Sequence, residues 1–187
     1  MVIHGFQKLT LLDYPGKVAC TLFSGGCNFR CPFCQNGNLV QHPEWEPVIP
    51  EEEIFAVLEK RRGVLDGVCV TGGEPTLDPD LERFVTKIKE LGYLVKLDTN
   101  GYRPEILKKL VEEKKIDYVA MDIKNAPSRY GETAGVKKID VMRINESVEF
   151  LKSGVVDYEF RTTLCKELHG REEILSLIHI SEPTRQE

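Results

Sequence analysis

Short apolar runs recur along the chain, separated by longer stretches of mixed or polar character. The runs are rich in Val, Leu, Ile and aromatic residues and span residues 18–23, 67–71, 93–98, 117–123 and 156–163. Runs of this length, bounded by turn residues, are typical of buried strands. The stretches between them carry helix start and stop signals, which predict helices over about 50–62, 78–92, 104–114 and 140–152.

The first of these helices is the most clearly marked. Pro50 stands at its first turn, and three glutamates follow where the helix dipole favours negative charge. Three basic residues stand near the other end, directly before Gly63. Strands and helices then alternate at intervals of roughly 25 to 40 residues, which indicates βαβ units on a parallel sheet. Right-handed crossovers roll such a series into a full or partial barrel.

Polar or glycine-rich residues stand at the end of each predicted strand. In parallel α/β folds the functional groups gather at the carboxyl ends of the strands. We therefore expect five clusters to face one mouth of the barrel: the cysteine loop 27–34, then residues 71–75, 98–101, 122–124 and 161–163.

The cysteine loop carries the strongest chemical signal. Cys27, Cys31 and Cys34 follow the first apolar run with C-x3-C-x2-C spacing. Three thiolates in eight residues can bind a metal centre from one side and leave a coordination position open. The alternative is a zinc site with a distant fourth ligand such as His42.

Composition narrows the possible functions. The chain has 187 residues, 41% of them hydrophobic and 29% charged, which is typical of one globular domain. A net charge of −5 gives no global reason to expect a nucleic-acid or membrane partner. The first residues lack the layout of a signal peptide, so we expect a cytoplasmic protein. In that compartment the unclustered Cys20, Cys69 and Cys165 are expected to be small core residues.

Some residues are less informative. His4, His42 and His169 have no partner pattern and are expected at the surface. Trp45 lies in the loop after the cysteines, where it either packs as a lid or binds a partner.

These motifs together resemble a known family. The cysteine spacing, aromatic Phe33 before the last cysteine, and Gly-Gly-Glu-Pro at residues 72–75 resemble radical S-adenosylmethionine (SAM) enzymes. The opening residues 5–8, the turn 13–16 and the loop 26–34 resemble, more narrowly, the activating proteins of anaerobic ribonucleoside-triphosphate reductase. Residues 98–101 and 122–124 also resemble pyruvate formate-lyase activating enzymes.

The resemblance implies a [4Fe-4S] cluster and SAM as cofactors. Cys27, Cys31 and Cys34 would bind three irons, and the amino and carboxylate groups of SAM would bind the fourth. One electron from the cluster would cleave SAM to methionine and a 5′-deoxyadenosyl radical that abstracts a hydrogen atom. The cofactors carry this chemistry, so no side chain is expected to be catalytic.

The resemblance also assigns roles at the other strand ends. Gly72 and Gly73 would let the backbone approach the methionine amino group, and Glu74 would add an anion near it. Further cofactor contacts are expected from Phe33, Asp98, Thr99, Asp122, Lys124 and Arg161. Asp98, Thr99 and Asp122 would hold a monovalent cation, and Lys124 and Arg161 would contact the carboxylate or ribose of SAM.

The implied partner is anaerobic ribonucleotide reductase or another glycyl-radical enzyme, with flavodoxin or ferredoxin as reductant. Alternatives are an activase of the pyruvate formate-lyase type and, less favoured, a 7-carboxy-7-deazaguanine synthase. From another class, the chain could be an iron–sulfur electron-transfer protein without SAM chemistry. The charged strand ends and Gly-Gly-Glu-Pro speak against that class.

The last residues carry a different signal. Residues 175–185 match the translation of a transposase-end sequencing adapter. We therefore expect an incomplete radical SAM domain over 1–174 and a non-native tail over 175–187, the alternative being a natural helix that runs into a polar tail. The expected fold is then α/β, a partial parallel (β/α)6 barrel of the TIM-like type that lacks its last β/α unit. Its open edge would expose apolar surface and favour aggregation.

Overall fold

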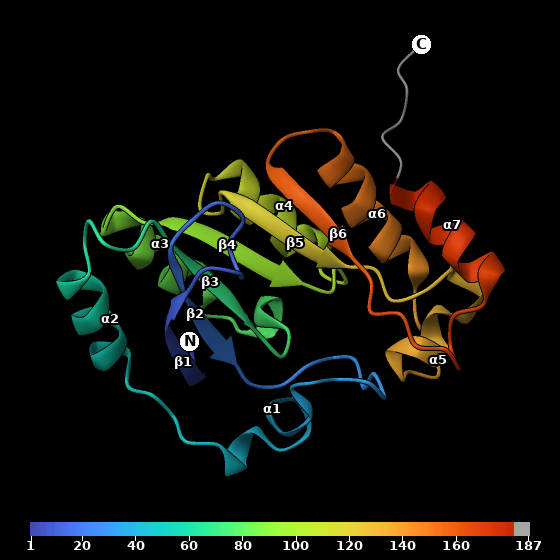
Figure 1. The fold of residues 1–187 in the computed structure, drawn as a ribbon, viewed down its shortest axis with the longest axis horizontal. Coiled ribbons are helices and arrows are strands. Elements are labelled where there is room, and N and C mark those ends of the chain that lie inside the picture. The colour runs from blue at the N-terminus through green and yellow to red at the C-terminus, as the bar shows by residue number, and fades with distance from the viewer. Residues whose placement is uncertain (182–187) are drawn as a thin grey trace.

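The computed structural model describes residues 1–181. Within this part of the chain lies one sheet of six strands, ordered β1-β2-β3-β4-β5-β6. The strands are β1 (Ile3–Thr10), β2 (Ala19–Ser24), β3 (Gly67–Gly72), β4 (Leu94–Thr99), β5 (Tyr118–Asp122) and β6 (Asp157–Arg161). β1 pairs antiparallel with β2, and every later pair is parallel (Figure 1). The fold is therefore α/β with a mostly parallel sheet, as the sequence predicts.

Helices connect the parallel strands. The main ones are α2 (Glu51–Lys60), α3 (Leu81–Glu90), α4 (Pro104–Glu112) and α6 (Val141–Lys152). The remaining ones are α1 (Gly37–Gln41), α5 (Tyr130–Ala134), α7 (Arg171–Ser181), η1 (Pro43–Trp45), η2 (Pro75–Leu77) and η3 (Pro127–Arg129). In Figure 1 the strands lie across the middle of the molecule, with α2 at one end and α6 and α7 at the other.

β1 is the one strand in the described residues that the apolar pattern did not predict. Its end residues Ile3 and Thr10 are buried, but the three residues before Thr10 are exposed. Its pairing with β2 also contains two register irregularities. A strand at the edge of a sheet needs few apolar residues, so its sequence resembles a polar loop.

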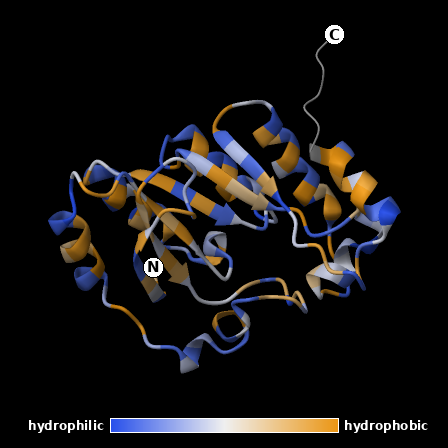
Figure 2. Cartoon of the chain, in the orientation of Figure 1, coloured by the Kyte–Doolittle hydropathy of each residue, from blue (hydrophilic) through white to orange (hydrophobic). Residues whose placement is uncertain are grey.

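The core lies between the sheet and the helices. Val68 and Val70 of β3, Leu97 of β4 and Val119 of β5 are fully buried. Each main helix places its apolar residues against the strands, and Figure 2 shows hydrophobic and hydrophilic residues alternating along these helices. The parallel strands thus form a rigid base whose carboxyl ends all point to one edge.

Two of the unclustered cysteines belong to this core. Cys20 and Cys69 are fully buried, which confirms the prediction for both, and burial raises the pKa of each thiol to about 12. Cys165 is only half-buried, in the loop that follows β6, so it is not a core residue.

α7 covers part of the segment that the adapter match singles out. Residues 175–181 continue the helix that begins at Arg171, and Leu177 packs against the core. Residues 182–187, the rest of that segment, lie outside the described part of the chain. Among residues 1–181, no helix is long and apolar enough to cross a membrane.

Candidate active site at the carboxyl edge of the sheet

The cysteine loop is fixed at several points by backbone hydrogen bonds. Where β2 ends, the carbonyl of Ser24 accepts from Gly73 N at 2.9 Å, and the carbonyl of Gly26 accepts from Glu74 N at 2.8 Å. In the middle of the loop, Arg30 N donates to the carbonyl of Ala134 in α5 at 2.8 Å. The loop is therefore held between the turn after β3 and the end of α5.

Glycines make this close approach possible. A Cβ at Gly73 would lie 1.8 Å from the carbonyl oxygen of Gly26, and one at Gly72 would lie 2.4 Å from the backbone of Ser24. Gly72 also has φ +114°, a conformation that side chains disfavour. Gly135 of the α5 end approaches the carbonyl of Arg30 in the same way, with a Cβ distance of 2.0 Å. Glycine is thus required at both positions after β3 by the packing of the cysteine loop, in addition to the predicted approach of the cofactor.

The predicted clusters meet around one cavity of about 490 Å³. Its walls include every site residue that the sequence predicted: Cys27, Cys31, Phe33, Cys34, Gly72, Gly73, Glu74, Asp98, Thr99, Asp122, Lys124 and Arg161. Asn36, Asn100, Thr162 and Thr163 also line it, although no role was predicted for them. The carboxyl ends of β3, β4, β5 and β6 therefore face the cysteine loop across a single space.

The three thiols differ in their surroundings. Burial raises the pKa of Cys27 to about 11 and also raises that of Cys31, whereas Cys34 is exposed. Cys27 Sγ accepts hydrogen bonds from Phe29 N at 3.3 Å and from Asn100 Nδ2 at 3.8 Å. Deprotonation of these two partly buried thiols is therefore favoured by an electropositive group, which a metal centre supplies.

The donor set fits an iron–sulfur cluster better than a zinc ion. Within residues 1–181, no three His, Cys, Asp or Glu side chains gather closely enough to hold one metal ion. His42, the suggested fourth zinc ligand, instead stacks on Trp45 with a centroid distance of 3.8 Å and contacts Glu44 through Nδ1 at 3.2 Å. A cluster spreads its thiolate ligands over several irons.

A buried polar atom beside the cysteines also fits a bound cluster. Asn28 Nδ2 is buried and, among the described residues, has no hydrogen-bond partner. Leaving a buried donor unsatisfied costs about 1–3 kcal/mol. An electron-rich group bound at the cysteines would accept from it.

Glu74 is buried deep in the wall of the cavity. Its carboxylate accepts from Thr76 N at 3.1 Å, Thr99 Oγ1 at 2.8 Å and Asn100 N at 2.7 Å, and also from Thr76 Oγ1. Desolvation outweighs these donors and raises the pKa of Glu74. The side chain thus joins the turn after β3 to the end of β4, and its predicted action on the cofactor amino group remains a prediction.

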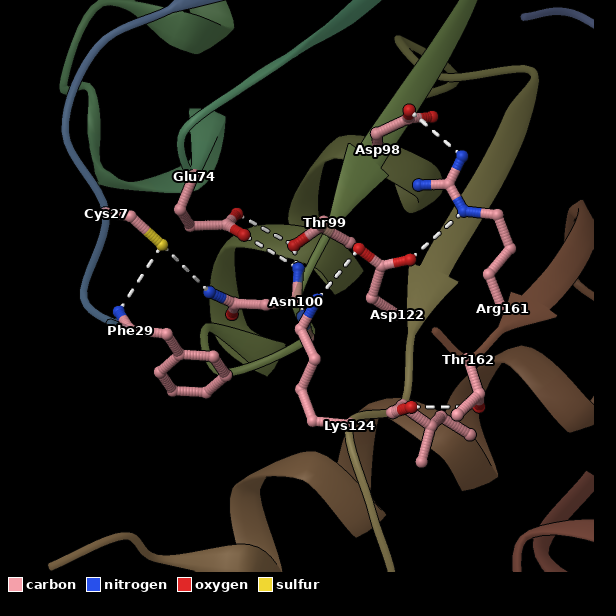
Figure 3. Close-up of polar contacts among 12 residues, drawn as sticks. Cys27, Phe29, Glu74, Asp98, Thr99, Asn100, Asp122, Lys124, Arg161 and Thr162 are labelled. Carbon is pink, nitrogen blue, oxygen red and sulfur yellow. Dashed lines mark hydrogen bonds and ion pairs between the residues drawn. The ribbon is translucent and has the colours of Figure 1, made fainter. Parts of the chain in front are cut away.

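Charged residues form a row across the ends of β4, β5 and β6 (Figure 3). Arg161 bridges two carboxylates, with Nη1 3.1 Å from Asp98 Oδ2 and Nε 3.1 Å from Asp122 Oδ1. Lys124 Nζ lies 3.0 Å from Asp122 Oδ2, and Lys96 Nζ pairs with Asp98. Burial alone would lower the pKa values of Lys124 and Arg161, but the neighbouring carboxylates raise both. A guanidinium therefore already lies between the two carboxylates expected to hold a monovalent cation.

The expectation that His169 lies at the surface is wrong. The ring is buried, with Nε2 2.9 Å from the carbonyl oxygen of Lys124 and Nδ1 3.1 Å from the amide nitrogen of Cys165. Thr162 Oγ1 adds a hydrogen bond to the carbonyl of Ile123 at 2.9 Å. The loop after β6 therefore supports the segment that carries Lys124. Residues 45 positions apart make this contact, so no local pattern could have predicted it.

Comparison with known proteins agrees with this geometry. The model of the radical SAM superfamily matches residues 21–166, which include the cysteine loop and all the strand ends around the cavity. The chain belongs to the radical SAM superfamily. Members of this superfamily are enzymes that carry out radical reactions with a [4Fe-4S] cluster and SAM.

Several radical SAM proteins are similar to this chain. A protein of Methanocaldococcus jannaschii, provisionally named a glycyl-radical enzyme activating enzyme, is 33% identical over 181 residues, which cover 92% of this chain and 72% of that protein. The 7-carboxy-7-deazaguanine synthase of Koribacter versatilis is 27% identical and covers 86% of this chain and 67% of its own length. The crystal structure of Streptococcus suis SuiB bound to SAM has the same fold, with a TM-score of 0.62 and 19% identity, and covers 84% of this chain and 34% of that one.

Proposed function

We propose that this radical SAM enzyme activates anaerobic ribonucleoside-triphosphate reductase by generating a glycyl radical on it. One observation carries the proposal: a cysteine loop and four strand ends enclose one cavity in a chain that is 33% identical, over 92% of its length, to a protein provisionally named a glycyl-radical enzyme activating enzyme. A second relative of Methanocaldococcus jannaschii with the same kind of name is 31% identical over 119 residues.

In this proposal the cysteine loop binds the cluster. Cys27, Cys31 and Cys34 supply three thiolates, which leaves one iron for SAM. When bound, the cluster supplies an electron and SAM supplies the carbon–sulfur bond that this electron cleaves. The protein's own work is to position the cofactors and exclude water. Phe33 and the turn after β3 form part of the wall that does so, and Asn36 fixes that turn by donating to the carbonyl of Gly72 at 2.8 Å.

The charged row orients the carboxylate of SAM in the proposed complex. Lys124 and Arg161 are the cations that contact its carboxylate or ribose. Asp98 and Asp122 hold these two side chains in place at the strand ends. Binding of SAM therefore does not have to restrict their motion further. Asp98, Thr99 and Asp122 remain the proposed ligands of a monovalent cation, which would have to share the two carboxylates with Arg161.

The proposed partners act at two different steps. A reduced flavodoxin or ferredoxin supplies the electron. The glycine-bearing loop of the reductase enters the cavity from its open side, where it supplies the hydrogen atom.

Anaerobic reconstitution of the full chain with iron and sulfide tests the proposal. After reduction with dithionite, added SAM should yield 5′-deoxyadenosine, and the further addition of anaerobic ribonucleoside-triphosphate reductase should give the electron paramagnetic resonance (EPR) doublet of a glycyl radical. Cys34→Ser should abolish both signals. Cys165→Ser is the matched control, since Cys165 lies outside the cavity, and it should keep both.

The outcomes separate the alternatives. Formation of 5′-deoxyadenosine without a glycyl radical on the reductase, but with one on pyruvate formate-lyase, would favour the sister activase. Failure with both partners would favour another radical SAM reaction, such as that of the similar 7-carboxy-7-deazaguanine synthase. A loaded cluster without 5′-deoxyadenosine would favour an electron-transfer protein.

A further inference from the structure

Cys27 differs from the other two cysteines in its hydrogen bonds. Its Sγ accepts from Phe29 N at 3.3 Å and from Asn100 Nδ2 at 3.8 Å (Figure 3). In the part of the chain that the structure describes, no other residue donates a hydrogen bond to the Sγ of Cys31 or Cys34. The environment of the three thiols is therefore asymmetric.

The orientation of the Asn100 amide is fixed by its neighbours. Its Oδ1 accepts from Tyr102 N at 3.0 Å, and a backbone N–H can only be met by the oxygen of the amide. Nδ2 must then face the cysteine loop, where it donates to Asn28 Oδ1 at 2.8 Å and to Cys27 Sγ. Both of its hydrogens thus have an acceptor.

The backbone of Asn100 is held as well. Its N–H donates to the buried carboxylate of Glu74 at 2.7 Å, and the whole residue is 5% exposed. Asn100 is therefore a rigid donor that does not depend on solvent. Within the described residues, this side chain donates a hydrogen bond to no other cysteine.

The bond changes its character when Cys27 becomes a ligand. As a thiol, Cys27 donates its own hydrogen to Asn28 Oδ1 at 3.8 Å. A thiolate has no hydrogen to donate and only accepts. Deprotonation leaves the donors from Asn100 and Phe29 as the hydrogen bonds to this sulfur.

We propose that Asn100 is a positioning residue that raises the reduction potential of the cluster through its N–H···S hydrogen bond to Cys27. The inference rests on the proposed ligation of the cluster by Cys27, but not on the identity of the partner enzyme. A one-electron reduction makes the cluster and its thiolates more negative, so a fixed donor stabilises the reduced state more than the oxidised one. Hydrogen bonds to the sulfurs are one of the factors that set such potentials.

An EPR-monitored redox titration of the reconstituted full chain, without SAM, tests this inference. Dithionite supplies the single electron. Asn100→Ala removes the donor, and the reduced-to-oxidised ratio at a fixed potential should fall about tenfold, which is a shift of about 59 mV to lower potential for one electron. Asn100→Asp should shift the potential further in the same direction, because it keeps an acceptor for Tyr102 N and turns an oxygen toward the sulfur.

Thr163→Val is the matched control. Thr163 lines the same cavity and, among the described residues, donates no hydrogen bond to a sulfur, so its loss should leave the potential unchanged. Asn100 variants that hold the cluster at the wild-type potential would overturn the inference. So would failure of both Asn100 variants to hold a cluster while Thr163→Val does, because Asn100 would then be needed to form the site and not to tune it. Lack of a cluster in the wild-type chain would instead refute the proposed ligation.

Discussion

The absence of a Cβ atom at Gly73 lets the cysteine loop pack against the turn after β3. Gly73→Ala would put a Cβ 1.8 Å from the backbone oxygen of Gly26, where no flexible side chain can move aside. We expect a loss of about 3 kcal/mol in the free energy of unfolding, together with reduced iron content. Urea unfolding and iron determination measure the two effects.

Gly37→Ala is the control for that substitution. Gly37 begins α1, and a Cβ added there would have no atom within 4 Å. The better helix propensity of alanine should raise the free energy of unfolding by up to about 1 kcal/mol. Equal iron content in the Gly73 and Gly37 variants would show that close packing of the turn after β3 against the cysteine loop is not needed for iron binding.

Glu74 gives the site a pH dependence at the residue scale. Its pKa is raised in the folded chain, so the folded state binds this proton more tightly than the unfolded state. That contribution to stability is complete below the ordinary glutamate pKa of 4.5 and is lost as the pH rises through the raised value. Glu74→Gln cannot ionise, so the stability of the variant relative to wild type should improve between pH 4.5 and pH 8.

Chemical denaturation of both proteins at several pH values measures this difference. Parallel stability curves for wild type and Glu74→Gln would show that Glu74 does not titrate differently in the folded chain. Groups whose titration the substitution leaves unchanged contribute equally to the stability of both proteins, so their effects cancel in the difference.

At the scale of elements, the sequence was most informative about the parallel strands. The apolar runs predicted β2 to β6 with ends within two residues of those observed. The reason is clearest for β2 to β5, because mostly buried strands leave a nearly continuous apolar run. The edge strand β1 and the short α1 and α5 left no such run. All predicted site residues line the cavity because topology alone brings the carboxyl ends of parallel strands together.

The missed contacts lie between strand ends and between loops. Asn100 stood inside the predicted cluster 98–101, but only the structure shows that its amide faces Cys27. The sequence likewise gave no sign that Arg161 would bridge Asp98 and Asp122, or that His169 would reach Lys124. Side-chain direction across a sheet edge depends on tertiary packing, which local patterns do not encode.

The loop after β6 should support SAM binding through His169. His169→Ala removes the ring that bridges the backbones of Lys124 and Cys165, and we expect a loss of about 2 kcal/mol in stability and weaker SAM binding. Equilibrium dialysis of SAM against the reconstituted chain measures the affinity. His42→Ala, which removes a ring stacked on exposed Trp45, should leave the affinity unchanged. A His169 variant of full affinity would show that the loop only stabilises the fold.

At the scale of the whole molecule, the paired strands supply one side of the site and loops supply the other. The cysteine loop touches the turn after β3 on one side and the end of α5 on the other. β6 pairs only with β5 among the described strands, and its residues are at most half-buried. The cavity between them therefore depends on loops for one of its walls.

Cluster binding should consequently stabilise the whole fold. A ligand that binds only the folded state shifts the unfolding equilibrium by mass action, and a metal site formed by folding converts binding energy into folding energy. We expect the reconstituted chain to unfold at higher denaturant concentration than the metal-free chain, measured anaerobically. Cys31→Ser should remove most of that difference.

The same linkage gives cluster loading a pH dependence. The thiols must lose their protons to bind iron, and burial raises the pKa of Cys27 to about 11 and that of Cys31 as well. Protons therefore compete with iron across the neutral range, and the stabilisation by the cluster should grow as the pH rises from 7 to 9. A stabilisation that is constant over this range would mean that the thiols of Cys27 and Cys31 do not release protons on binding. Cooperative unfolding of the metal-free chain at the same denaturant concentration as the loaded chain would show that the site forms without its cluster.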